Sequence, residues 1–326
     1  FEFGKFDRQW GFGKRFLHIS DKPPSYPQFG FKWDINENFK LIYFHGFLNS
    51  GISDTNRSIF YNNKRSLKIS RNIAAHRIEW KLAKNIIIGL NESVVYATRI
   101  LDPHYLIPIT LFYPIENYLG DTDNLQMGCD AIYSFNKKNK FYFGFFMDEL
   151  TPEWIFNSKN HNWFAWQFGY SANNILFDDE TIFIEYNWTD QRIYKHKFVI
   201  NDYYSHNQPL GFWAGPHAQE FLIYYTLSFK NNTISLKYSN VKRGLSTREM
   251  VEDNYADNQA DRFEYGSEIK NLFTMFLERS SKVNDLYYRI GLNYVKFINV
   301  GFNISEIGLS NEKFSLNIGI YYNIIN

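Results

Sequence analysis

The stretch FLIYYTLSFKNNTISLKYS, residues 221–239, decides the fold. Its large apolar side chains occupy every second position on both sides of the polar turn 230–232: Phe221, Ile223, Tyr225, Leu227, Phe229, Ile234, Leu236 and Tyr238. Successive side chains of a β-strand point to opposite faces, so this spacing predicts two antiparallel strands with one apolar and one polar face. Each strand is close to the roughly nine to eleven residues that a tilted strand needs to cross a bilayer.

The same alternation recurs along most of the chain, in residues 29–35, 76–82, 125–133, 288–294 and 314–322. Tight polar turns lie at residues 36–38, 84–85, 136–139 and 230–232, whereas long segments span residues 49–73, 97–123, 150–161, 189–218 and 241–264. Alternating short and long connections are typical of outer-membrane barrels, which have short periplasmic turns and long external loops. We therefore expect the four turns to be periplasmic and the loops 49–73, 150–161 and 189–218 to be external.

These patterns predict an all-β fold, a single antiparallel transmembrane β-barrel of about 16–18 strands over residues 1–326, in a bacterial outer membrane. These segments correspond to about fifteen strands. Barrels of this class have an even number of strands, so we expect one more strand within 189–218 or 241–264. The chain already alternates at Phe1-Glu2-Phe3-Gly4-Lys5, so we expect the N-terminal part of the barrel to be missing from it. The sequence has no run of about eighteen apolar residues that would predict a transmembrane helix.

The composition narrows the class of partner. The chain has 35 basic and 34 acidic residues, which argues against nucleic acid, because phosphates require a basic excess. Aromatic residues make up 20% of the chain although its mean hydropathy is −0.41, so large rings and polar residues must be interleaved. Either a soluble sandwich with one wet face or a barrel with a wet lumen would account for this pattern.

Signatures of catalysis and of metal binding are weak throughout. The sequence has no Gly-x-Ser-x-Gly elbow, no His-Glu-x-x-His and no phosphate-binding loop, and Gly11-Phe12-Gly13 lacks a third glycine. The eight histidines have no ligand spacing, and the single Cys129 can form neither an intramolecular disulfide nor a metal-binding pair. We expect no enzyme activity, no catalytic residue, no metal and no cofactor.

The candidate ligand-binding residues lie in two long segments rich in aromatic and amide side chains, 150–166 and 189–217. Aromatic rings can stack on the apolar faces of sugars, while amide and charged groups bond the hydroxyls. We therefore expect a surface polysaccharide to be bound by Trp154, Trp163, Tyr203, Tyr204 and Trp213. The alternative is that these segments fold inward and pack together as a plug.

The polar strand faces carry charges of both signs, for example at Lys32, Asp34, Arg77, Asp130 and Lys237. One interpretation is a charged channel or a sugar-binding lumen. The other is a ladder of neighbouring ion pairs that fills a wide interior. We favour the ladder, because the lumen of a barrel is expected to be polar.

Short motifs resemble the Wzi-like capsule-assembly family. GKFDRQWGFG at residues 4–13, followed by SDKPPSYP at 20–27, is similar to the family's strand that ends in Trp-Gly-x-Gly and its Ser-Asp-x-x-Pro segment. DPHYLIP at 102–108 and GDTDN at 120–124 look like the central loop, and DLYYRIGL at 285–292 is similar to the closing strands. The resemblance implies an outer-membrane barrel, eighteen-stranded in the family, that acts as a lectin for capsular polysaccharide or exopolysaccharide. The family's N-terminal periplasmic helices have no counterpart here.

We expect a non-enzymatic barrel that binds or helps to assemble surface polysaccharide, with outer-membrane lipid and other envelope proteins as further partners. One alternative is a channel, or a barrel subunit of a larger outer-membrane complex. The other is a soluble β-rich glycan-active enzyme. A requirement for detergent would separate the barrel functions from the enzyme, and conductance in a planar bilayer or co-purification with envelope proteins would favour the channel or complex.

Overall fold

Fourteen strands form one antiparallel meander. The computed structural model describes residues 1–60, 65–148, 162–255, 262–280, 286–302 and 310–322. Each strand of the main sheet pairs with its neighbours in chain order: β1 (Glu2–Phe6), β2 (Tyr26–Asp34), β3 (Phe39–Ser53), β4 (Lys68–Ala83), β5 (Ile86–Ala97), β6 (Asn124–Ser134), β7 (Asn139–Met147), β8 (Phe164–Asn173), β9 (Glu180–Thr189), β12 (Ala218–Phe229), β13 (Asn232–Gly244), β14 (Ser267–Ser280), β15 (Leu286–Ile298) and β16 (Ser310–Tyr322). A separate hairpin consists of β10 (Tyr204–Ser205) and β11 (Gln208–Pro209).

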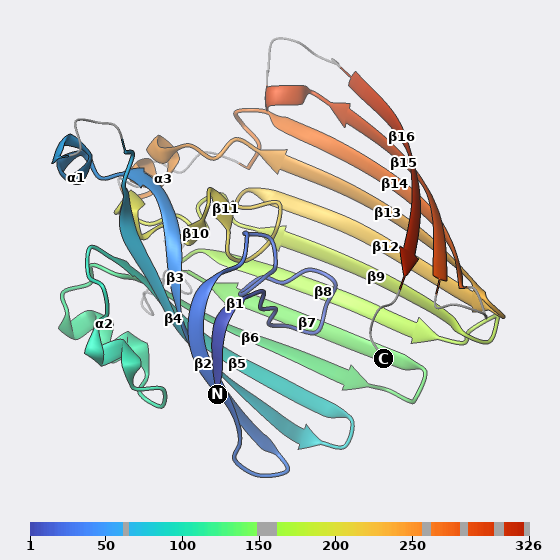
Figure 1. The fold of residues 1–326 in the computed structure, drawn as a ribbon, viewed down its shortest axis with the longest axis horizontal. Helices are drawn as coiled ribbons and strands as arrows, with labels where there is room; N and C mark the ends of the chain where they lie inside the picture. Colours follow the sequence, from blue (N-terminus) through green and yellow to red (C-terminus); the bar gives the residue numbers. More distant parts are fainter. Residues whose placement is uncertain (61–64, 149–161, 256–261, 281–285, 303–309, 323–326) are drawn as a thin grey trace.

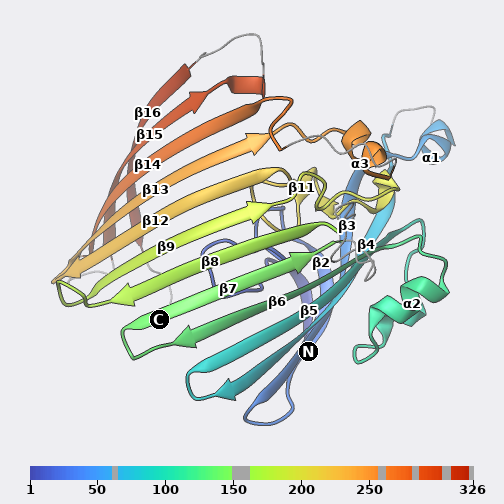
Figure 2. The same ribbon diagram turned by 180° about the vertical axis from the view of Figure 1, so that it is seen from behind.

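The sheet curls around a lumen (Figure 1), and strands β5 to β9 form the wall that Figure 2 shows from behind. Its end strands β1 and β16 pair only with β2 and β15, so over the described residues the sheet is open and the predicted closure is not seen. Its 14 strands are also fewer than the number predicted. The strand expected within 189–218 or 241–264 is not found there: the first segment holds the small hairpin, and the described part of the second leads from β13 into a helix.

Short turns and long connections lie at opposite ends of the strands, which confirms the predicted alternation. The helices α1 (Thr55–Phe60), α2 (Phe112–Tyr118) and α3 (Arg248–Tyr255) all lie at the end with the long connections, on the left in Figure 1. In the described ranges, no helix is long and apolar enough to cross a membrane. Which end faces the periplasm stays a prediction.

From β9 to β16 the outward face of the sheet is apolar on every strand. The register places six side chains in one continuous row: Ile182, Tyr225, Leu236, Met275, Leu292 and Leu316. Leu292 and Leu316 are 53% and 61% exposed. An exposed apolar surface of this extent marks a contact with lipid or protein, and the outward face of a transmembrane barrel is in contact with lipid.

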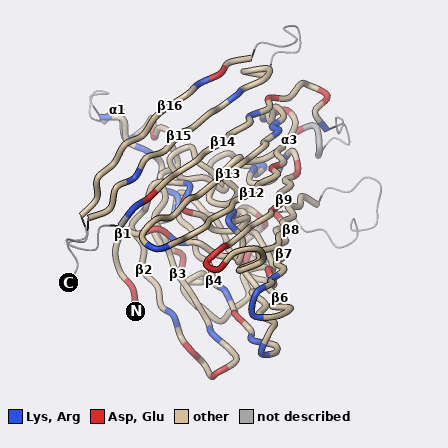
Figure 3. The backbone as a smooth tube through the Cα atoms, turned by 90° about the vertical axis from the view of Figure 1, so that its right-hand side faces the viewer, with Lys and Arg blue, Asp and Glu red and all other residues tan. Residues whose placement is uncertain are grey.

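The inward face is polar, and ion pairs link its strands. Arg77 of β4 donates hydrogen bonds to Glu79 (2.9 Å), to Asn91 of β5 (2.7 Å) and to Asp130 of β6 (2.7 Å). Gly89 leaves room for the guanidinium, since a Cβ there would lie 2.2 Å from Arg77 Nη2. Similar cross-strand pairs join Lys32 to Glu2 and Arg289 to Glu278. Ion pairs of the predicted ladder are therefore present at Lys32, Arg77 and Arg289, and Figure 3 shows acidic and basic residues interspersed over the molecule.

The connection between β5 and β6, residues 98–123, folds back over the outward face of the sheet; we call it the outer flap. It contains η1 (Pro103–Leu106) and α2. Tyr43 Oη donates to the carbonyl of Tyr105 (2.9 Å), and Glu92 accepts from the backbone N–H groups of Phe112 (2.8 Å) and Tyr113 (2.9 Å). The flap therefore covers a polar part of the outward face that lipid could not satisfy.

Candidate functional site

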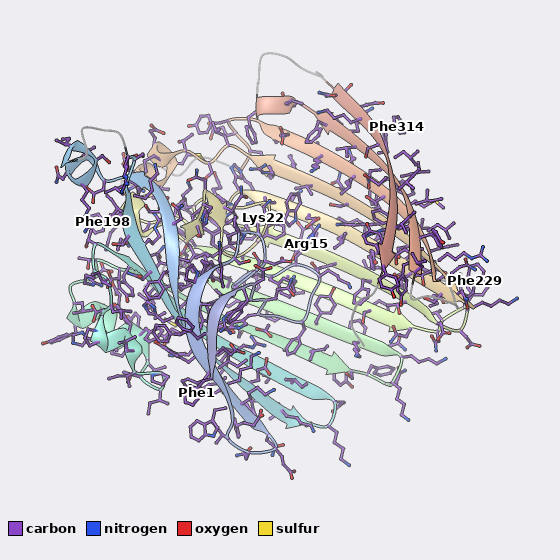
Figure 4. All side chains as sticks on the ribbon, viewed as in Figure 1. Phe1, Arg15, Lys22, Phe198, Phe229 and Phe314 are labelled. Atoms are coloured by element: carbon purple, nitrogen blue, oxygen red, sulfur yellow. The ribbon has the colours of Figure 1, made fainter. Side chains whose placement is uncertain are left out.

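Two connections fold into the lumen and pack together; we call them the plug. The first joins β1 to β2 (residues 7–25), and the second joins β9 to β12 (residues 190–217). Both contribute buried side chains to one apolar cluster with inward residues of the sheet: Trp10, Leu17, Ile19, Ile193, Tyr194, Tyr203, Leu210, Phe212 and Ala214. Figure 4 shows Arg15 and Lys22 of the first segment within the curl of the sheet.

The wall of the lumen satisfies backbone groups of the first plug segment. The N–H groups of Lys14 and Arg15 donate to the Glu185 carboxylate on β9 (2.6 and 3.1 Å), and Gln167 on β8 donates to the Arg15 carbonyl (2.7 Å). Gly13 passes so close to the wall that a Cβ would lie 2.6 Å from side-chain atoms of Gln167 and Glu185. Because buried backbone groups need partners, these two side chains fix where the segment crosses the lumen.

Tyrosine hydroxyls connect the two plug segments. Tyr194 Oη donates to the carbonyl of Leu17 (2.7 Å), and Tyr203 Oη donates to the carbonyl of His18 (2.9 Å). Burial raises the pKa of Tyr194 and of Tyr203 far above the usual range, so both remain protonated donors. The two rings stack with centroids 5.8 Å apart, which makes the plug a packed unit.

A cavity of about 330 Å³ lies between the plug and the inward faces of β13 and β14. We call it the basic pocket. Basic side chains dominate its lining, which includes one tryptophan: Lys14, Arg15, Phe16, Ser20, Asp21, Lys22, Trp213, Lys237, Ser239, Lys270 and Leu272. Both plug segments and two strands contribute, so the pocket exists only when the plug is docked.

Glu220, on the inward face of β12, lies beside the pocket and binds three of the residues that line it. Its fully buried carboxylate accepts hydrogen bonds from Trp213 Nε1 (2.7 Å), Ser239 Oγ (2.6 Å) and two nitrogens of Arg15 (2.7 and 2.6 Å). These bonds fix the half-buried indole against the cavity. The Arg15 guanidinium and Lys270 Nζ lie 5.2 and 5.6 Å from an indole ring centroid.

Four lysines of the pocket have no acidic partner. Over the residues that the structure describes, no carboxylate oxygen lies within 4.0 Å of the amino groups of Lys14, Lys22, Lys237 and Lys270. The fifth cation, Arg15, is neutralised by Glu220 at 2.6 Å. Lys237 is thus an exception to the ladder of ion pairs on the inward face.

The structure separates the five residues predicted to bind a glycan. Trp154 lies outside the described residues. Trp163 and Tyr203 are fully buried, so neither presents a ring face to a ligand. Tyr204 is half-buried and lines a second cavity, and Trp213 lines the basic pocket. The segment 190–217 folds into the lumen as part of the plug, which is the alternative that we considered for 189–217. The prediction of a free external loop at 189–218 is therefore wrong.

The sequence did not point to the basic pocket. Lys14, Arg15 and Lys22 fall within or beside the motifs that resemble a known family, but no pattern in 7–25 predicts that this segment enters the lumen. Alternation does place Lys237 on the polar face of its strand, as the structure confirms. The available signal was the interruption of alternation between two strands by Trp10, Leu17 and Ile19, which need a core to cover them.

The titratable side chains around the plug offer no metal site. In the described ranges, no group of three or more His, Cys, Asp or Glu side chains is placed to hold a metal ion. His18 is buried with Nε2 3.0 Å from Ser93 Oγ. Burial, reinforced by the charge of Arg77, lowers the pKa of His18 to about 3, so the imidazole is neutral and serves packing.

No family model matches the chain, and no curated protein matches its sequence. Among solved structures, the chain is similar to Wzi of Escherichia coli, described as an outer-membrane, carbohydrate-binding β-barrel involved in group 1 capsule assembly. The TM-score is 0.63 at 14% identity, and the match covers 98% of this chain and 66% of Wzi. The chain therefore spans slightly less than two thirds of that protein. OprD of Pseudomonas aeruginosa gives a TM-score of 0.49 at 13% identity, and the match covers 99% of this chain and 76% of OprD.

At this identity the likeness to Wzi concerns the fold. It confirms the predicted fold, which is that of an outer-membrane β-barrel. The apolar outward face agrees with this fold, since a bilayer is the environment that covers such a surface. The predicted location in a bacterial outer membrane follows from both.

Proposed function

We propose that the protein is a non-enzymatic outer-membrane barrel that binds surface polysaccharide in its lumen, at the basic pocket. The observation that carries the proposal is the indole of Trp213, which Glu220 fixes against a cavity that also holds hydroxyl and amino donors. An aromatic face beside polar donors is the combination that sugar rings require. Wzi, which shares the fold, is described as a carbohydrate-binding barrel.

The pocket is preorganised for such a ligand. Arg15 and Ser239 hold Glu220, and Glu220 in turn holds Trp213, so little side-chain freedom remains to be lost on binding. Each sugar hydroxyl exchanges a water partner for a protein partner at small net gain, so a single contact is weak. A polymer that returns to the pocket repeatedly, or occupies several copies of the protein, would be retained through its high effective concentration.

The other predicted glycan residues take different roles in this proposal. Tyr203 supports the site by packing, since it is fully buried in the apolar cluster against which Trp213 packs. Trp163 is fully buried and makes no contact with the ligand. Tyr204 offers a half-buried ring at the second cavity, where a further sugar of the same polymer could lie. Contact by Trp154 stays a prediction.

A channel has less support than a polysaccharide-binding barrel. The plug packs against inward side chains from β3 to β13, including Phe44, Phe146 and Val241, and so occupies much of the lumen that a channel would need to keep open. No observation favours a soluble enzyme, because the outward face is apolar on every strand from β9 to β16.

The test is binding of the detergent-solubilised protein to polysaccharide stripped from the bacterium that makes it. Trp213→Ala removes the stacking surface, and we expect an affinity about tenfold weaker than that of the wild type. The matched control is Trp33→Ala, because Trp33 is exposed near the short-turn end of β2, away from the plug. Equal affinity of Trp213→Ala and wild type would contradict the proposed site.

A further inference from the structure

The basic pocket has a local excess of positive charge, although basic and acidic residues are nearly equal in number over the whole chain. The whole chain has 35 basic and 34 acidic residues. The lining of the pocket and the adjacent Glu220 together hold five basic side chains and two acidic ones, Asp21 and Glu220, which leaves a formal excess of three positive charges. Arg243 and Glu268, which also act on Lys270, carry opposite charges and leave this excess unchanged. Elsewhere on the inward face, cations such as Arg77 and Arg289 are paired across strands. The excess is therefore a local property of this site.

The excess charge faces open space. Lys237 and Lys270 project from neighbouring strands, while Lys22 and Lys14 come from the plug on the other side of the cavity. Arg15 forms an ion pair with Glu220, which neutralises its charge. Like charges around one cavity repel each other, and an anion within the cavity would remove that repulsion. The lumen is wet but partly enclosed, so the attraction is screened less than at an open surface.

We infer that the pocket takes an acidic sugar unit, one that bears a carboxylate or a phosphate group. This inference rests on the proposed function and names the class of polysaccharide. The sugar ring lies against Trp213, and its anionic group accepts hydrogen bonds from the amino groups of Lys237 and Lys270. Lysine is a compact point charge with three donors, which suits either anion without selecting between them. Neutral polysaccharides meet the same indole but leave the lysines uncompensated.

The test uses the full chain in detergent and the stripped surface polysaccharide as the probe. Lys237→Gln combined with Lys270→Gln removes two charges and keeps side chains of similar length. Lys81→Gln combined with Lys84→Gln is the matched control, because both lysines are exposed at the short turn between β4 and β5. Heat-dependent gel mobility checks that each barrel has folded.

Two chemical treatments of the polymer distinguish the source of the negative charge. In one arm its carboxylates are reduced to alcohols, and in the other its phosphates are removed with mild hydrofluoric acid. We expect one treatment to weaken wild-type binding at least tenfold, because hydrogen bonds to charged groups are lost. The Lys237/Lys270 variant should bind the untreated polymer with the same deficit, whereas the control variant should bind it like the wild type. Raising the salt concentration should weaken wild-type binding in parallel, which tests the inference without any variant.

The outcomes separate the inference from the function on which it rests. If both treated polymers bind as tightly as the untreated one, and salt has no effect, the inference is overturned while polysaccharide binding stands. If the wild type binds neither treated nor untreated polymer, both the proposed function and the inference that rests on it are contradicted. Loss of binding after either treatment, matched by the lysine variant, supports an acidic ligand and identifies its charged group.

Discussion

At the scale of single residues, Glu220 determines the geometry of the candidate site. It comes from β12 and is fully buried, yet its partners come from three other elements: Arg15 and Trp213 from the two plug segments and Ser239 from β13. A buried carboxylate is stable only with such partners, and in return it fixes their positions. The pocket and the docking of the plug therefore depend on the same side chain.

Replacing Glu220 should release the plug. Glu220→Gln leaves Arg15 without a counter-charge in a half-buried position, and removing one partner of a buried pair costs about 3 kcal/mol. We expect the free energy of unfolding to fall by about that amount in urea titrations. The double variant Arg15→Gln with Glu220→Gln should lose less than the single one, because no unpaired charge remains. A single variant as stable as the wild type would show that the pair does not hold the plug.

Residue type alone could not sort the aromatic candidates. Trp163, Tyr203 and Trp213 all lie in segments that join strands, so the local sequence does not show which of them is buried and which lines a cavity. In the structure Tyr203 is buried against His18, more than 180 residues earlier in the chain, whereas Trp213 is bonded to Glu220 at the edge of a cavity. The difference arises from contacts with remote strands, which no local pattern contains.

At the scale of elements, the strands were predictable and the paths of their connections were not. Alternation predicts strands because one side of the sheet faces lipid and the other faces water. Apolar and polar residues must therefore alternate along each strand, as they do in segments such as 221–239. A connection has no such constraint. Residues 7–25 and 190–217 turn inward while 98–123 turns outward, since each docks on side chains that β5, β9 and β12 present to it.

The outer flap should loosen as the pH rises. Burial, and then the nearby charge of Asp121, raises the pKa of Glu116 from 4.5 to about 8. Between these values the docked flap binds more protons than the undocked one, so docking is strongest below about pH 4.5 and weakens as the pH rises toward 8. Hydrogen exchange of the α2 amides, corrected for the intrinsic pH dependence of exchange, should show protection falling across this window. Glu116→Gln should remove the slope; an unchanged slope in that variant would mean that another group controls the flap.

At the scale of the whole molecule, the protein combines three surfaces of different chemistry. The outward face is apolar and suits lipid, the inward face is an ion-pair ladder, and the plug turns one part of that ladder into a basic pocket. Because the overall charge is nearly zero, this segregation could not be seen in the composition. It depends on the fold, which brings Lys14, Trp213, Lys237 and Lys270 to one cavity from distant parts of the chain.

The most direct test of this account is the amount of polysaccharide that stays on the cell. Bacteria that carry the triple variant Trp213→Ala, Lys237→Gln and Lys270→Gln would be compared with bacteria that carry Trp33→Ala, Lys81→Gln and Lys84→Gln, after gel mobility has shown both barrels to be folded. We predict that the pocket variant sheds most of its surface polymer into the medium, whereas the control retains it as the wild type does. Equal retention by the two variants would contradict the claim that the pocket in the lumen holds the polysaccharide.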